Sequence, residues 1–576
     1  MARIRLIEIN HFRSIKSLNW SPENGVNCLI GPGDSGKSTI LDAIDLCLGA
    51  RRGLTLSDTD FYGLDVSQPI VISLTLGDLS DRLKNLEYYG DCLRGYHDLL
   101  GEVEDEPRQN LETVLTVRLT VTADLEPVWS LYSDRTALFD PPKMLQWKDR
   151  TAIAPVRLGH HPNSHLSWTR GSVLNRLSEN RTEIGLALVD AAREARVGFG
   201  AKAAPQLAAT LTKVTEEAHN LGIPVGSSVT ALLDAHAVSF GDGAISLHSE
   251  AGVPLRNLGT GSTRLLIAGL HRVVAETANI VLIDEVEHGL EPHRINRLLD
   301  SLGAKDKTEP LQVFMTTHSP VVLRELNGDQ LRIVRSAPDK HDARWVGTTN
   351  EIQAAIRIFP EAFLAKTVLV CEGASEIGLI RGIDRFMTAS GNPSLQAHGV
   401  AYVDAAGGDA DRAFIRANVF QRLGYRVAVL QDNDKTPSAD IVKKFVDAGG
   451  FHLAWRNGRA LEDELFASLP AVAILALLTR AQELTEEGLV NSHIVTTSQG
   501  KSNLALVLQE GDTGDYSGET RELLGRSSRI RKAGWFKSIS KMEAVSHEIL
   551  CAHWNTTDTD FTESIRRLLR WSYGQA

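Results

Sequence analysis

Short apolar runs and alternating apolar and polar positions dominate the beginning of the chain, and both patterns are typical of β-strands. Between these strands, apolar residues recur at helical spacing in STILDAIDLCLG, residues 38–49. Strands and helices therefore follow one another, which indicates an α/β fold. The predicted strands in this part are RIRLIEINHF (3–12), GVNCLIG (25–31), PIVISLTL (69–76) and TVLTVRLTV (113–121).

The middle of the chain changes to a purely helical pattern. SVLNRLSENRTEIGLALVDAAREAR (172–196) and PQLAATLTKVTEEAHNLG (205–222) carry apolar residues at helical spacing and show no strand signal. We interpret this stretch as a helical insertion that is long enough to serve as a dimerisation arm. Strand signals return in NIVLIDE (279–285) and LQVFMTTHS (311–319), which are apolar runs of the kind buried in parallel sheets.

A second block of alternating strands and helices follows a junction at residues 350–363. Its predicted strands lie in TVLVCEG (367–373), GVAYVDAAGG (399–408) and RVAVLQDNDK (426–435). The expected organisation is a first α/β domain in two parts (1–164 and 241–350), the helical insertion (165–240), and a second α/β domain with a helical, basic C-terminal extension (360–576).

Composition describes an ordinary soluble protein of more than one domain. The 576 residues are too many for one hydrophobic core, and 43% are hydrophobic and 23% charged. The net charge of −11 gives no global basic field, so nucleic-acid binding would need a local basic path. The five cysteines form no CxxC pair, and the apolar run AVAILALL from Ala471 is too short to span a membrane. We therefore expect a cytoplasmic protein without a membrane partner.

The stretch GPGDSGKST, which begins at Gly31, matches G-x-x-x-x-G-K-[ST] between a predicted strand and a predicted helix. Glycine lets the backbone N–H groups and the helix N-terminus face phosphate. Lys37 would reach the β- and γ-phosphates and Ser38 would hold Mg²⁺. The residues predicted to bind ATP here are Gly31, Gly33, Ser35, Gly36, Lys37, Ser38 and Thr39.

Acidic and basic groups at later strand ends complete this predicted ATPase site. Asp284 and Glu285 follow the apolar strand NIVLI, where Asp284 would bind Mg²⁺ and Glu285 would polarise the attacking water. His318 follows the next apolar strand and is predicted to sense the γ-phosphate. A lone histidine is more often a simple surface or core residue, but its place at a strand end favours the sensor.

The second α/β block carries acids where the first carries a lysine. In LVCEGASE, Glu372 and Glu376 occupy the turn after a strand, and Asp432 and Asp434 end the strand VAVLQ. Such a set of carboxylates is repulsive unless divalent cations neutralise it. Two Mg²⁺ or Mn²⁺ ions could then hold the attacking and leaving oxygens of a phosphodiester. The alternative is a pair of unrelated acidic loop ends.

The motifs of the first domain resemble the ABC-type ATPase head of the SMC and RecF group. INHFRSI (9–15) resembles the N-terminal strand motif of that group, which makes Arg13 a candidate nucleotide contact. NLGTGSTRLL, which starts at Asn257, lies where such heads carry a signature loop, so Gly261 is a further candidate. It reads GTGS instead of an LSGG-type sequence. The resemblance implies that two heads meet across the nucleotide, and hence a homodimer or a higher homo-oligomer.

The acidic motifs of the second domain resemble a Toprim domain. An ABC head followed by Toprim is similar to the OLD (overcoming lysogenisation defect) family of nucleases, which includes the nuclease subunit of the Gabija phage-defence system. The resemblance implies a metal set of Glu372, Glu376, Asp432, Asp434 and Glu462, with Glu372 also a candidate general base. Glu464 is a rival to Glu462, and an exposed acidic helix face is the alternative to both. Gly407 and Gly408 would have backbone roles, while Asp404 is read as incidental.

A basic run near the C-terminus, RSSRIRKAGWFKSISK, contains no acid. It could follow a phosphate backbone and place a cation at the cleaved bond. The resemblance assigns the catalytic lysine to Lys537, with Lys541 as its rival; a solvated basic helix face is the alternative. The basic residues of this run are Arg526, Arg529, Arg531, Lys532, Lys537 and Lys541.

Together these features predict an ATP-regulated DNA endonuclease that uses two Mg²⁺ or Mn²⁺ ions at the Toprim site and one Mg²⁺ with ATP. Family resemblance adds a role in anti-phage defence and a helicase or other defence-system partner. A RecF-like DNA clamp without cleavage is one alternative. Topoisomerase or primase chemistry is another, although Tyr516 and Tyr573 lie in segments that offer no DNA-gate domain.

Overall fold

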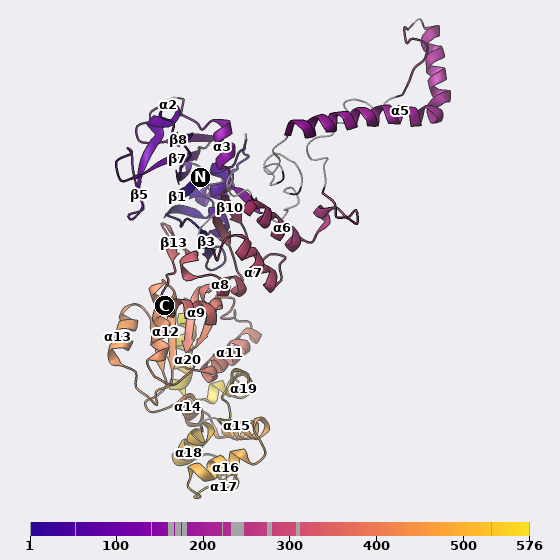
Figure 1. The fold of residues 1–576 in the computed structure, drawn as a ribbon. Coiled ribbons are helices and arrows are strands. Elements are labelled where there is room, and N and C mark those ends of the chain that lie inside the picture. Colours follow the sequence, from indigo (N-terminus) through magenta and orange to yellow (C-terminus); the bar gives the residue numbers. More distant parts are fainter. Residues whose placement is uncertain are drawn as a thin grey trace. The chain divides into compact units, whose positions relative to one another are not determined.

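The computed structural model describes residues 2–51, 53–139, 141–158, 166, 174, 181–221, 223–231, 247–273, 279–306, 311–530 and 533–574. Parts of the expected insertion (165, 167–173, 175–180, 222 and 232–240) and the basic residues Arg531 and Lys532 lie outside this description. The chain divides into one compact unit of residues 1–28, 36–317 and 338–341 and another of residues 29–35, 318–337 and 342–576. Figure 1 shows the elements of both.

The first unit contains an antiparallel run of strands. Burial alternates along much of the first strand, Arg3–Phe12, which matches the period-two pattern of its sequence, whereas Ile70–Gly77 is buried almost throughout. In order of pairing the strands are β6 (Glu102–Glu104), β5 (Leu93–His97), β7 (Glu112–Val121), β4 (Ile70–Gly77), β1 (Arg3–Phe12) and β2 (Ile15–Trp20), and β8 (Pro127–Tyr132) also pairs with β7.

The same unit contains a parallel run of β9 (Val156–Leu158), β10 (Ile280–Ile283) and β11 (Gln312–Thr316). All four residues of β10 are buried, as expected for a strand covered on both faces. Strand β3 (Val26–Ile30) is also wholly buried and leads into the phosphate-loop motif. The helices that matter for the site are α1 (Lys37–Leu48), α6 (Thr260–Val273) and α7 (Pro292–Ser301); shorter ones are α2 (Leu86–Tyr89) and α3 (Trp147–Ile153).

The helical pattern between residues 181 and 220 forms one helix, α5 (Arg181–Asn220). It joins stretches that the sequence pattern separates, because Pro205 lies inside the helix and does not end it. Proline removes one backbone hydrogen bond and favours a kink, and α5 is visibly bent in Figure 1. Among the helices that the structure describes, none combines the length and apolarity needed to cross a lipid bilayer.

The second unit contains a four-stranded parallel sheet in the order β15 (Val400–Asp404), β14 (Thr367–Cys371), β16 (Arg426–Gln431), β17 (Phe451–Ala454). Helices α11 (Ala374–Ala389), α12 (Arg412–Arg422) and α13 (Ala439–Asp447) follow its first three strands along the chain. Cys371 is in register with Asp404 on one side and Leu430 on the other. The residues that follow these strands therefore meet at one edge of the sheet.

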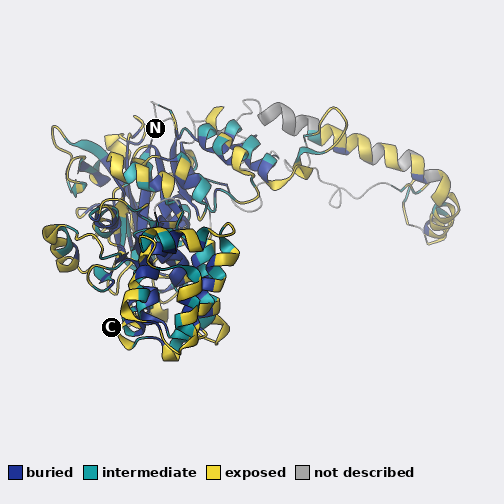
Figure 2. Cartoon of the chain, turned by 90° about the horizontal axis from the view of Figure 1, so that it is seen from below, coloured by how far each residue is buried: buried dark blue, intermediate teal, exposed yellow. Residues whose placement is uncertain are grey.

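Helices make up most of the remaining second unit and surround a large apolar core. Figure 2 shows buried residues concentrated inside and exposed residues on the outer helix faces. Trp535 and Phe536, which interrupt the basic run in the sequence, are fully buried in this core. The other elements are α8 (Pro320–Glu325), β12 (Leu331–Ser336), β13 (His341–Trp345), α9 (Asn350–Ile358), α10 (Pro360–Phe363), α14 (Leu461–Ser468), α15 (Ala471–Leu484), α16 (Leu489–Thr497), α17 (Leu504–Asp512), α18 (Gly518–Ser528), α19 (Ile539–Val545) and α20 (Thr559–Ser572).

Two glycines on α11 allow α19 to approach very closely. A Cβ atom added at Gly378 would lie 2.5 Å from the carbonyl oxygen of Ile539, and one at Gly382 would lie 2.5 Å from that of Glu543. Because these glycines are four residues apart, they share one face of α11. They fix the position of the segment before α19, which carries Lys537.

Candidate active sites: a phosphate loop and an acidic cluster

The start of α1 brings together the groups predicted to hold nucleotide-bound Mg²⁺. Gly36 precedes the helix with a φ of 88°, a conformation that favours glycine. The hydroxyl of Ser38 donates to Asp284 Oδ1 at 3.0 Å. The structure therefore joins the predicted serine and aspartate in one polar contact. Lys37 is buried, and the hydroxyl of Thr39 lies 3.2 Å from that of Ser14.

Thr316, at the end of β11, is a member of this site that sequence reasoning missed. Its hydroxyl donates to Asp284 Oδ1 at 2.5 Å and accepts the backbone N–H of Glu285 at 2.9 Å. It thus orients the carboxylate and fixes the backbone that carries the proposed water-polarising glutamate. Glu285 itself has a φ of 47°, and its side chain is about half exposed. Positive φ at a non-glycine residue is a strained conformation often found at functional sites.

The first residues of the phosphate loop belong to the second unit. Gly31 has a φ of 134°, and an added Cβ would lie 2.6 Å from the carbonyl oxygen of Val334, so only glycine fits there. Gly33 has open space around it and Ser35 is buried. His318 is exposed two residues beyond the end of β11.

The signature-like loop leads directly into α6. Gly261 lies so close to the carbonyl oxygen of Gly289 that a side chain would not fit. Arg264, which the sequence did not single out, is buried and donates to the carbonyl oxygens of Glu285 at 3.0 Å and His288 at 3.2 Å. Burial lowers the pKa of its guanidinium. This arginine ties α6 to the turn that carries the acidic pair.

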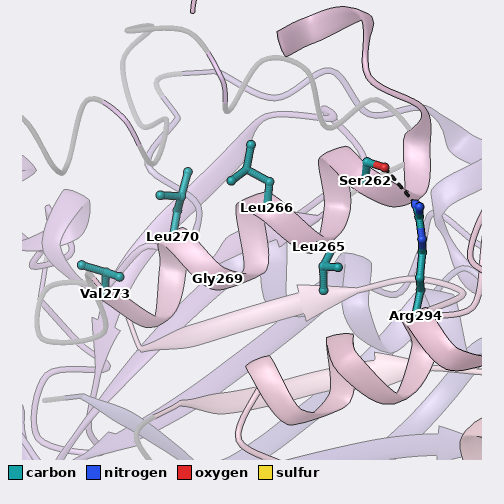
Figure 3. A pocket seen from close by; sticks show the side chains of 7 residues that line it. All are labelled: Ser262, Leu265, Leu266, Gly269, Leu270, Val273 and Arg294. Carbon is teal, nitrogen blue, oxygen red and sulfur yellow. Dashed lines mark hydrogen bonds between the residues drawn. The ribbon is translucent and has the colours of Figure 1, made fainter. Parts of the chain in front are cut away.

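Beyond this loop, α6 presents a shallow apolar groove of about 540 Å³ (Figure 3). Arg294 of α7 closes one end by donating to the Ser262 hydroxyl at 2.9 Å. The remaining lining residues all come from α6 and are Leu265, Leu266, Gly269, Leu270 and Val273.

Arg13 has two acidic partners in this structure. Its guanidinium forms ion pairs with Asp60, at 2.8 Å, and with Asp42. A nucleotide contact through Arg13 would therefore compete with these carboxylates.

In the second unit, the four predicted acids surround the ends of β14 and β16. Glu372 Oε2 accepts the backbone N–H of Asp432 at 3.0 Å, which links the two strand ends directly. Glu376 Oε2 accepts the N–H of Gly373 at 2.9 Å and so closes the first turn of α11. Asp432 Oδ1 accepts the N–H of Leu461, which brings the start of α14 and Glu462 to the same edge.

Their interaction partners distinguish Glu462 from Glu464. Both are buried, so the alternative of an exposed acidic helix face is wrong. Glu464 forms ion pairs with Arg456 at 2.5 Å and Arg459 at 3.1 Å. Glu462 acts electrostatically on Glu376 and Asp432, and its Oε1 has no hydrogen-bond partner among the described residues. Glu462 is therefore the member of the acidic cluster.

The carboxylates of this cluster disfavour each other's ionisation. Burial, followed by the fields of Glu462 and Glu372, raises the pKa of Glu376 to about 8. Burial, followed by the fields of Glu376, Glu462 and Glu372, raises the pKa of Asp432 well above its usual range. Burial also raises the pKa of Glu372 and Glu462, while Lys537 opposes the shift in both. Such a set favours an added cation.

The donor set fits a hard divalent cation, because it consists of carboxylate oxygens and includes a buried oxygen without a partner. Among the residues described, however, no group of three or more His, Cys, Asp or Glu side chains already stands in ligating geometry. Cation binding therefore requires the side chains to turn toward the ion.

The two rival lysines also have different surroundings. Lys541 donates to the carbonyl oxygen of Leu484 at 3.1 Å and so fastens α19 to the end of α15. Lys537 is exposed directly after the buried Trp535 and Phe536, and its charge acts on Glu372 and Glu462. The structure thus brings Lys537 to the acidic cluster. The aromatic residues beside it anchor the segment in the core and do not face solvent.

Gly407 and Gly408 shape the neighbouring loop after β15. The N–H of Gly407 donates to the carbonyl oxygen of Glu372 at 2.8 Å, and the carbonyl oxygen of Gly408 accepts from Lys435 at 2.9 Å. Both glycines have positive φ values of 58° and 96°. Asp404 Oδ1 accepts the N–H of Ala406 within its own turn.

Fold and sites define a P-loop ATPase domain followed by a parallel α/β domain with an acidic strand edge. Residues 26–324 match the family model described as "AAA domain, putative AbiEii toxin, Type IV TA system", and residues 363–434 match "Overcoming lysogenization defect protein-like, TOPRIM domain". The first match covers more than half of the chain, which therefore belongs to this AAA-domain family and carries an OLD-like TOPRIM domain. The predicted family and α/β fold class are confirmed.

Curated relatives of the chain include a nuclease and a DNA repair protein. The chain is 23% identical over 370 residues to the OLD nuclease of Thermus scotoductus, covering 58% of this chain and 62% of that protein. It is 42% identical over 66 residues to the DNA replication and repair protein RecF of Chlorobium luteolum, covering 10% of this chain and 18% of that protein. The chain thus spans less than two thirds of the length of these relatives.

Matches among solved structures include the SMC head domain from Thermotoga maritima and the recombination mediator protein RecF with ATP. The first has a TM-score of 0.29 and 15% identity and covers 60% of this chain and 100% of the solved one. The second has a TM-score of 0.31 and 11% identity and covers 60% and 99%.

Proposed function

We propose that this protein is a DNA endonuclease that requires divalent metal ions and is controlled by ATP. The observation that carries the proposal is the acidic cluster of Glu372, Glu376, Asp432, Asp434 and Glu462. It lies at the carboxyl edge of a TOPRIM sheet with Lys537 beside it. An idle domain would have no use for a buried, mutually repelling set of carboxylates. The OLD nuclease among the relatives supports the same activity.

A divalent cation held by these carboxylates would polarise the phosphodiester and lower the pKa of a water molecule. The protein groups divide the remaining work. Glu372 Oε2 accepts the hydrogen bond from the Asp432 N–H. Its other carboxylate oxygen could accept a proton or bind the cation. Lys537 places positive charge beside the cluster, where it can stabilise the leaving oxygen. Asp434 is held by Arg529 at the exposed side of the cluster.

The ATPase half supports control by nucleotide. Lys37, Ser38 and Asp284 surround the start of α1, and Arg264 links the signature-like loop to the turn that carries Glu285. We infer that ATP binding by this site, with one Mg²⁺, brings two heads together, and that the segment 165–240 contributes to the dimer. His318, Gly261 and Arg13 remain predicted nucleotide contacts. The role in phage defence and a helicase or other partner rest on the OLD likeness alone.

The test is cleavage of supercoiled plasmid by the full chain with Mg²⁺ or Mn²⁺, with and without ATP. Asp432→Asn should abolish nicking and linearisation and leave ATP binding unchanged. Asp404→Asn is the matched control, because Asp404 ends the neighbouring strand and its carboxylate forms a hydrogen bond only within its own turn among the described residues. It should cut like the wild type. Lys37→Ala should remove only the effect of ATP.

Other outcomes identify the alternatives. Tight DNA binding without nicking in every lane would indicate a RecF-like clamp. A covalent protein–DNA adduct after denaturation would indicate topoisomerase chemistry. The structure gives that reading no support, because Tyr516 is only 4% exposed and Tyr573 packs edge-on against His398.

A further inference from the structure

Next to the acidic cluster, the second unit contains a cavity of about 580 Å³ lined by arginines. The turn after β17, helix α14 and helix α18 form its walls. The charged residues that line it are Arg459, Asp463, Arg521, Glu522, Arg526 and Arg529. Four guanidinium groups around one cavity form a setting suited to a phosphodiester.

Two of these arginines are committed to the protein. Arg521 donates to the carbonyl oxygens of Phe466 and Leu469 and pairs with Asp515 at 2.7 Å, so it closes the end of α14. Arg459 pairs with Glu464. If either arginine left its partner, a buried hydrogen-bond acceptor would lose its donor.

Arg526 and Arg529 differ from this pair. Arg526 is exposed in the last turn of α18 and has no hydrogen bond or ion pair within the described part of the chain. Arg529 follows one helical turn later on the same side. It bridges Asp434 Oδ2 at 2.8 Å and Asp463 Oδ2 at 3.1 Å.

The two carboxylates held by Arg529 are not equivalent. Asp463 also accepts the N–H of Ala460 at 3.0 Å, so it is fixed at the start of α14. Asp434 has Arg529 as its sole partner among the residues described. Asp434 also belongs to the metal set of the proposed function. The single positive charge of Arg529 therefore neutralises the same carboxylate that a divalent cation would bind.

A divalent cation on Asp434 and the guanidinium of Arg529 at 2.8 Å from the same carboxylate would repel each other. Cation binding to Asp434 therefore displaces Arg529 from this carboxylate, and the side chain can turn into the cavity that it lines. A DNA phosphate in the cavity would accept the released guanidinium.

We propose that this cavity binds a backbone phosphate of DNA, and that Arg529 exchanges Asp434 for this phosphate when the divalent cation binds. Arg526 binds the phosphate whether or not the cation is present. Arg529 is a positioning residue that couples binding of the cation to binding of the phosphate. Because coupling between two binding sites is reciprocal, DNA raises metal affinity by as much as metal raises DNA affinity. The inference rests on the proposed function, whose metal site it uses.

The test measures Mn²⁺ binding to the full chain without ATP, through the EPR signal of free Mn²⁺. Each variant is titrated with and without a short DNA duplex whose phosphorothioate linkages slow cleavage. In the wild type, duplex should raise Mn²⁺ affinity by about twofold to fivefold, the size expected for release of one partly exposed ion pair. Without duplex, Arg529→Gln should already bind Mn²⁺ as tightly as the wild type does with duplex, because the competing ion pair with Asp434 is gone. It should gain nothing when duplex is added.

Two further variants separate charge from packing. Arg529→Lys keeps the competing charge and should retain weak Mn²⁺ binding that duplex strengthens. Arg526→Gln, in the last turn of α18 just before Arg529, is the matched control. It should weaken duplex binding and leave the Mn²⁺ affinity of the free protein unchanged.

The inference is overturned if Arg529→Gln leaves Mn²⁺ affinity at the wild-type value, or if duplex still strengthens Mn²⁺ binding in that variant. Failure of the proposed function has a different signature. In that case the wild type shows no Mn²⁺ binding that Asp432→Asn removes, and no variant at position 529 changes the result.

Discussion

Metal-free protein should lose stability around the acidic cluster as the pH rises, and Glu376 allows the size of the effect to be calculated. This side chain is 3% exposed, and burial together with Glu462 and Glu372 raises its pKa from 4.5 to about 8. Between those two values the folded state binds a proton that the unfolded state has released. The stability contributed by this proton is therefore fully present below about pH 4.5 and is lost as the pH rises toward 8.

Each pH unit within this window removes up to about 1.4 kcal/mol for one such group, so a rise from about pH 5 to about pH 7 removes about 3 kcal/mol. This loss corresponds to a fall in local hydrogen-exchange protection on the order of a hundred-fold. The Glu376→Gln variant should show a smaller slope. Its amide carbonyl still accepts the Gly373 N–H, but it carries no ionisable group.

The assay is hydrogen exchange with mass spectrometry in EDTA, read on peptides from β14 and the first half of α11. Protection factors are compared so that the intrinsic pH dependence of exchange is removed. Glu361→Gln, which changes an exposed glutamate of the same unit, should keep the wild-type slope. Saturating Mn²⁺ should restore protection at the higher pH. Flat or rising protection between pH 5 and 7 in the metal-free wild type would refute the reasoning.

Two matched pairs provide the remaining predictions. In EDTA, Glu462→Gln should stabilise the second unit by about 1 kcal/mol, because it relieves repulsion with Glu376 and Asp432. Glu464→Gln should destabilise the unit by about 2 kcal/mol, because Arg456 and Arg459 each lose a charged partner. Denaturant unfolding of both variants, monitored by hydrogen exchange, measures these changes. A change in unfolding free energy of the same sign in both variants would contradict the prediction. Lys537→Met should lower the cleavage rate on the order of a hundred-fold without changing stability. Lys541→Met should instead lose about 1 kcal/mol of stability with its bond to the Leu484 carbonyl and retain cleavage; a plasmid assay that ranks the two in the opposite order would assign the catalytic lysine to Lys541.

The sequence predicts the parts of both sites that depend on local pattern. The phosphate loop is one continuous stretch, and its glycines are required by backbone geometry that the structure shows at Gly31 and Gly36. Glu372 and Asp432 could be paired in advance because parallel strands place their carboxyl ends at a common edge, and the bond between them bears this out.

The rest depends on contacts between distant segments, which have no local signal. Thr316 matters because β11 lies beside β10, and Arg264 matters because the beginning of α6 contacts the turn that carries Glu285. The sequence could not choose between Glu462 and Glu464, since only the folded chain brings arginines to one of them. The ion pair between Arg529 and Asp434 was missed for the same reason.

The close approach of α11 and α19 has a consequence for synthesis of the protein. Glu372 and Glu376 leave the ribosome long before Lys537, and the lysine reaches them only after α19 has packed against Gly378 and Gly382. Contacts between such distant segments form late, because the loop between them must close first. A growing or truncated chain that stops before α19 can therefore build the acidic strand edge but lacks the cation beside it. For the nuclease activity proposed above, cutting should then appear only in chains that are synthesised past this helix.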